Sequence, residues 1–69
     1  MNIMEAREKI KKKIEKYPEV NGVGIKEEDN EQIIVVYLSS ENKSVREKIP
    51  QTIEGIKIKI EVVGEIKPL

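Results

Sequence analysis

The sequence predicts a small two-layer α+β domain in the order α-β-β-α-β, with a three-stranded mixed sheet and helices on one of its faces. Apolar residues recur at helical spacing over residues 3–17, run without interruption over 33–38 and alternate strictly with charged residues over 56–62. With only 69 residues, the chain is expected to be one domain, 1–69, close to the lower size limit for folding without staples.

The first predicted element is an amphipathic helix over residues 3–17. Asn2 provides an N-cap, and Glu5 stands three residues later, as in a capping box. Pro18 ends the helix because it excludes the preceding residue from the α region. One apolar stripe is expected, made of Ile3, Ala6, Ile10, Ile14 and Tyr17.

Two strands are predicted next, at about residues 20–26 and at 32–38, joined by a polar turn over 27–31. So short a connection makes them antiparallel neighbours. Ser44 and Glu47 form a capping box before a short helix at 45–49, which Pro50 ends. A turn at Glu54-Gly55 then leads into the third strand, 56–63.

The second strand is apolar on both faces, and a chain of this length is expected to need a partner to cover both. The face that carries Tyr37 suits a partly wet surface, because its hydroxyl needs a hydrogen-bond partner. Register is undecided from sequence, so the row Ile34, Val36 and Leu38 is the alternative. The candidate interaction face consists of Gly22, Gly24, Ile33, Val35, Tyr37, Lys57 and Lys59.

Glycines in a strand often mark close approach by a ligand or another backbone. Gly22 and Gly24 would equally suit a bulge, and the tail residues Ile66 and Leu69 would equally cover the apolar strand. An exposed apolar row of this kind indicates an interaction site, and homodimerisation is its commonest form.

The composition argues against several functions. There is no cysteine or histidine, so disulfides, thiolate chemistry and the usual zinc sites are absent, and neither cofactor nor metal is expected. Four Ser and Thr hydroxyls have no histidine to activate them, so we expect no enzyme. Thirteen basic residues balance thirteen acidic ones, which gives no field for nucleic acid or a membrane surface.

The N-terminus lacks a basic segment followed by an apolar run, and no apolar stretch approaches about 20 residues, so a cytoplasmic protein is expected. Isoleucine, lysine and glutamate dominate the composition, as in thermophile proteins or in the products of AT-rich genomes.

Five segments carry a family resemblance: Asn21-Gly-Val-Gly-Ile25, Ile34-Val-Val-Tyr-Leu38, Ile49-Pro50, Ile53-Glu-Gly55 and Val62-Val-Gly-Glu-Ile66. Together they resemble the small N-terminal module found ahead of trypsin-like serine-peptidase-like domains in some bacterial proteins. The resemblance covers nearly the whole chain and departs at Lys26, where the pattern often has glycine. It implies a freestanding accessory module with no triad residue and no protease activity.

These observations predict a non-catalytic module that self-associates as a homo-oligomer, a dimer first of all, or docks an unknown protein through the candidate face. The alternative is a peptide- or small-ligand-binding domain that uses the same face or an edge strand.

Overall fold

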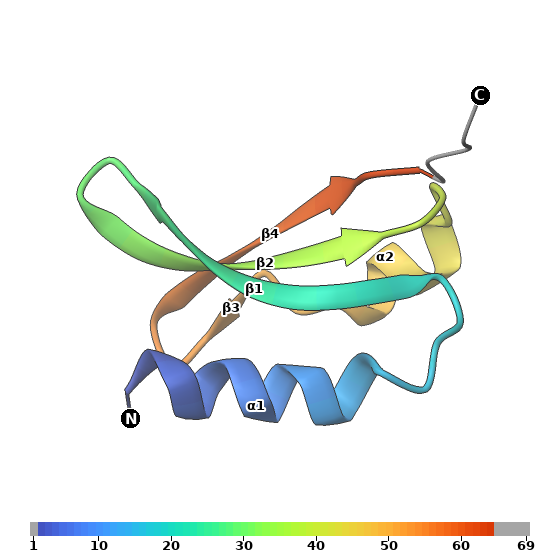
Figure 1. Ribbon diagram of the computed structural model, residues 1–69. Coiled ribbons are helices and arrows are strands. Elements are labelled where there is room, and N and C mark those ends of the chain that lie inside the picture. The colour runs from blue at the N-terminus through green and yellow to red at the C-terminus, as the bar shows by residue number, and fades with distance from the viewer. Residues whose placement is uncertain (1, 65–69) are drawn as a thin grey trace.

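The computed structural model describes residues 2–64 and shows a small α+β domain with a four-stranded mixed sheet (Figure 1). The strand order is β1-β2-β4-β3, in which β1 and β2 are antiparallel, β2 and β4 parallel, and β4 and β3 antiparallel. Its elements are α1 (Ile3–Ile14), β1 (Val20–Glu28), β2 (Glu31–Leu38), α2 (Lys43–Lys48), β3 (Thr52–Ile53) and β4 (Ile56–Val62).

The predicted three-stranded sheet is therefore corrected to four strands by the two-residue strand β3. Ile53 pairs with Ile56 across a turn whose residues Glu54 and Gly55 both have positive φ, at 50° and 79°. This is the backbone of a tight two-residue hairpin, which matches the twist of the strands it joins. Two residues are too few for a periodicity signal, so only the Glu-Gly pair between two isoleucines pointed to this strand.

The β1–β2 hairpin is also tighter than predicted. Asp29 and Asn30 alone form the turn, with φ of 52° and 64°, and Glu28 faces Glu31 as a strand pair. Short polar side chains tolerate the left-handed region better than other residues, which suits them to this turn. The predicted turn over residues 27–31 was too long because its flanking charges were taken as loop.

The helix ends differ from the prediction at two places. The Asn2 side chain accepts a hydrogen bond from the Glu5 N–H at 2.9 Å, which confirms this N-cap. The helix stops at Ile14, three residues before the predicted end. The cap of α2 is Asn42, whose side-chain oxygen accepts from the Val45 N–H at 3.2 Å, and the predicted cap Ser44 lies inside the helix.

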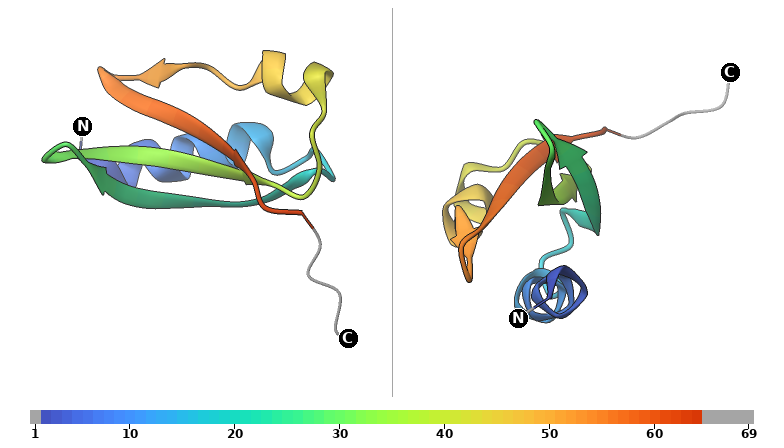
Figure 2. Two further views of the ribbon diagram at one scale, coloured as in Figure 1. Left: turned by 90° about the horizontal axis from the view of Figure 1, so that it is seen from above. Right: turned by 90° about the vertical axis from the view of Figure 1, so that its left-hand side faces the viewer.

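One hydrophobic core lies between α1 and the sheet. The prediction of helices on one face holds for α1, whereas α2 lies beyond β4 at the edge of the sheet and still contributes side chains to the core (Figure 2). The buried members of the core are Ala6, Ile10, Ile14, Val23, Ile34, Val36, Leu38, Val45, Ile49 and Ile58. No helix among residues 2–64 has both the length and the apolar character needed to cross a membrane.

Candidate functional site

The seven predicted site residues lie on the side of the sheet opposite α1, which we call the outer face. Strand register places Gly24 beside Val35 and Val35 beside Lys59, so β1, β2 and β4 meet in one row. Tyr37 lies between Gly22 and Glu61 in the next row. The row of Ile34, Val36 and Leu38 belongs to the core, which settles the register question.

The expectation that this chain needs a partner to cover both faces of β2 is wrong. Ile33 is 2% exposed and Val35 is 0% exposed, although neither α1 nor α2 lies over the outer face (Figure 2). Among residues 2–64, the side chains of the strands themselves lie over the outer face. The tail residues Ile66 and Leu69, the alternative cover that the sequence offered, lie outside the described residues.

Two ion pairs close the outer face by crossing β2. Lys26 Nζ on β1 lies 3.5 Å from Glu61 Oε1 on β4, and Lys59 Nζ on β4 lies 3.3 Å from Glu28 Oε2 on β1. By the strand register, the first pair crosses β2 at the level of Val35 and the second at the level of Ile33. Long lysine stems can cover apolar surface while their charged ends stay in water.

Gly24 and Tyr37 cover a further part of this face. A Cβ atom added to Gly24 would lie 3.2 Å from Tyr37 Cε2, so the ring lies directly over the glycine. The glycine thus gives the tyrosine ring room to lie across β1. No atom lies within 4 Å of a Cβ added to Gly22, so the face is open space at that position.

Backbone groups that point away from the sheet lie along the outward edge of β4. The Ile58 N–H donates to the Gln51 carbonyl at 2.8 Å on the side of β3, and the Val63 N–H donates to the Leu38 carbonyl at 2.8 Å on the side of β2. Backbone groups alternate in direction along a strand, so those of Ile60 and Val62 point away from β2. Within residues 2–64, β3 ends before it reaches them.

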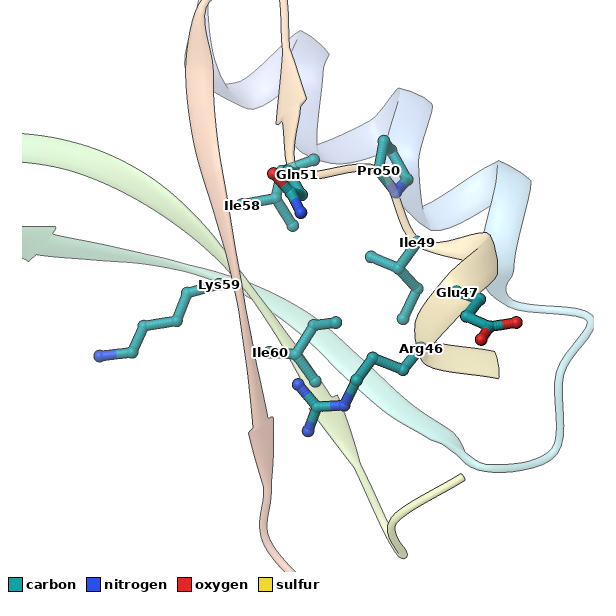
Figure 3. Close-up of a pocket in the computed structure, with 8 residues that line it drawn as sticks. All are labelled: Arg46, Glu47, Ile49, Pro50, Gln51, Ile58, Lys59 and Ile60. Carbon is teal, nitrogen blue, oxygen red and sulfur yellow. The ribbon is translucent and has the colours of Figure 1, made fainter. Parts of the chain in front are cut away.

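A groove of about 700 Å³ lies beside this edge, between α2 and β4 (Figure 3). Figure 3 shows the side chains of Ile49 and Ile60 facing each other across it, while Lys59 points away toward the outer face. We call this feature the α2–β4 groove. Its lining consists of Arg46, Glu47, Ile49, Pro50, Gln51, Ile58, Lys59 and Ile60.

Arg46 lies at one end of the groove, and its guanidinium is held by Glu41. The Nε and Nη2 atoms donate to the two carboxylate oxygens at 2.8 Å and 2.7 Å. This paired hydrogen bonding lowers the pKa of Glu41 and raises that of Arg46. The guanidinium already has the two-pronged geometry in which arginine binds carboxylates.

The groove was not foreseen from sequence. The alternation of residues 56–62 placed Ile58 and Ile60 on one face, but only the strand order shows that β4 has an open edge and that α2 lies beside it. Among the described residues, no three acidic side chains lie close enough together to share a metal ion.

No protein-family model, curated protein or solved structure matches this chain. The resemblance to the accessory module of serine-peptidase-like proteins therefore stays a prediction.

Proposed function

We propose that the protein is a non-catalytic docking module that binds an extended segment of a partner protein in the α2–β4 groove. The segment adds to the sheet beside β4, as extended peptides add to exposed strand edges in other domains. The observation that carries this proposal is the outward direction of the Ile60 and Val62 backbone groups beside the α2–β4 groove.

The lining of the groove indicates which segment would fit. A strand placed beside β4 presents every second side chain to the groove, where Ile49, Ile58 and Ile60 favour an aliphatic residue. At the end of the groove, Arg46 uses Nε and Nη2 to bind Glu41, and the remaining N–H groups of its guanidinium favour a second carboxylate. The occupant is therefore an extended segment in which an aliphatic residue is accompanied by an acidic one.

Replacing Val62 with proline tests this mode of binding. Proline removes the outward N–H of Val62 but no hydrogen bond to β2, so the fold should be retained. Peptides are first selected on the wild-type protein from a displayed random library. They should bind this variant at least about tenfold more weakly, because the hydrogen bond from the Val62 N–H and the fit at the strand edge are lost. Fluorescence anisotropy with the selected peptides measures the change.

Met4→Ala is the matched control, because Met4 is 57% exposed on α1 and lies outside the groove. Its affinity should equal that of the wild type. Selected peptides that bind Val62→Pro as tightly as the wild type, or that lose affinity for Met4→Ala, would contradict docking at the edge of β4.

Self-association through the outer face is the second candidate, and its charge pattern favours it. The crossing ion pairs place two lysines and two glutamates on one face. In a symmetric dimer, the lysines of one copy can pair with the glutamates of the other. This candidate predicts a dimer in a sedimentation dilution series that weakens as salt is raised. A mass that stays monomeric at every concentration would exclude it.

A further inference from the structure

The other edge of the sheet is β1, and its outward groups follow from the hairpin. Glu28 faces Glu31 directly across the two-residue turn, so their backbone groups point toward each other. Alternation along the strand then turns the N–H and C=O groups of Val23 and Ile25 outward, away from β2. β1 therefore presents an edge to which another strand can add.

A side chain from α1 occupies the middle of this edge. The Nε atom of Arg7 donates to the outward carbonyl of Val23 at 2.9 Å. A second guanidinium nitrogen of Arg7 lies 2.9 Å from Glu8 Oε1, which holds the group in place. The side chain of Arg7 is only 27% exposed, so it packs along the sheet rather than extending into water.

Arg7 covers segment 22–25 of the β1 edge, where no charged residue of β1 itself discourages another strand from pairing. Charged residues follow at Lys26, Glu27 and Glu28, and the register shifts between Val20 and Gly22. Charges and irregularities of this kind discourage a second strand from pairing. The segment 22–25 between them, Gly-Val-Gly-Ile, carries no charge of its own.

We propose that Arg7 keeps β1 from pairing with β1 of a second copy of this chain. Without the arginine, two copies would join antiparallel through segment 22–25, each using the outward groups of Val23 and Ile25. This interface is separate from the α2–β4 groove at the opposite edge, so the proposal does not depend on peptide docking.

Arg7→Met tests the proposal, because methionine keeps the helix propensity and much of the apolar stem but removes the donor and the charge. Sedimentation across a dilution series is run on the wild type, on Arg7→Met and on Lys11→Met. The Lys11 variant removes one positive charge from an exposed position one turn along the same helix. Hydrogen exchange of the Ile25 amide is followed at low and high protein concentration.

We expect Arg7→Met to associate about tenfold more tightly than the wild type, with the Ile25 amide slowing as concentration rises. Lys11→Met should behave like the wild type. Arg7→Lys, which keeps the charge without the planar fork, should fall between the two.

The proposal is overturned if folded Arg7→Met has the mass of the wild type at every concentration. It is equally overturned if the mass rises while exchange at Ile25 stays independent of concentration. If both Arg7 variants unfold, the contact supports the fold rather than covering an edge, and the proposal also fails.

Discussion

Replacing Leu38 with alanine is expected to destabilise the protein by about 2–5 kcal/mol. Leu38 is 0% exposed and belongs to the core between α1 and the sheet, so the truncation leaves a cavity. A domain of this length has a total stability of only roughly 3–10 kcal/mol, so the variant should be partly or largely unfolded at 25 °C. Urea denaturation followed by circular dichroism measures the loss.

Val62→Ala is the comparison for this experiment. Val62 is 44% exposed at the end of β4, and its truncation should cost less than about 1 kcal/mol. Equal losses for Leu38→Ala and Val62→Ala would mean that the core does not lie where the structure places it.

Replacing Val35 with lysine is expected to cost at least about 2 kcal/mol, from lost apolar burial and from bringing a third amine between two lysines. Val35 is 0% exposed on the outer face, below the ion pair of Lys26 and Glu61. The new side chain must displace this pair to reach water. Thermal and urea unfolding give the change in the free energy of unfolding.

Gly22→Lys is the matched control, because it adds the same charge to the same face at a position with open space around it. Its stability should stay within about 0.5 kcal/mol of the wild type. If Val35→Lys is as stable as Gly22→Lys and only loses self-association, Val35 serves a subunit interface rather than the fold of one chain.

Val35→Lys and Gly22→Lys test self-association through the outer face, the alternative to docking in the α2–β4 groove. An outer face that closes itself with ion pairs and a tyrosine ring offers a partner little exposed apolar surface. The edge of β4 offers outward-pointing backbone groups and a groove, which give an extended partner both affinity and register. The edge is therefore the stronger candidate site.

Sequence periodicity predicted the elements that are long enough to carry it. The amphipathic stripe of α1, the apolar run of β2 and the alternation of β4 were each visible over five or more residues. Periodicity did not predict β3, which has only two residues, and it did not place the ends of the helices correctly. At the start of α2, Asn42 and Ser44 are both favourable N-cap residues. Their capping preferences are too similar for the sequence pattern to decide between them.

The sequence by itself determined the α+β class and the antiparallel pairing of β1 with β2, because these depend on local spacing and turn chemistry. It left two rows of β2 open for the outer face, and the structure decided that Ile33, Val35 and Tyr37 lie there. Only the tertiary structure decided that the outer face is closed and that β4 has an open edge beside α2. Both depend on which distant strands become neighbours, as when Lys26 meets Glu61 across β2. Contacts between residues 35 positions apart leave no periodic signal in the chain.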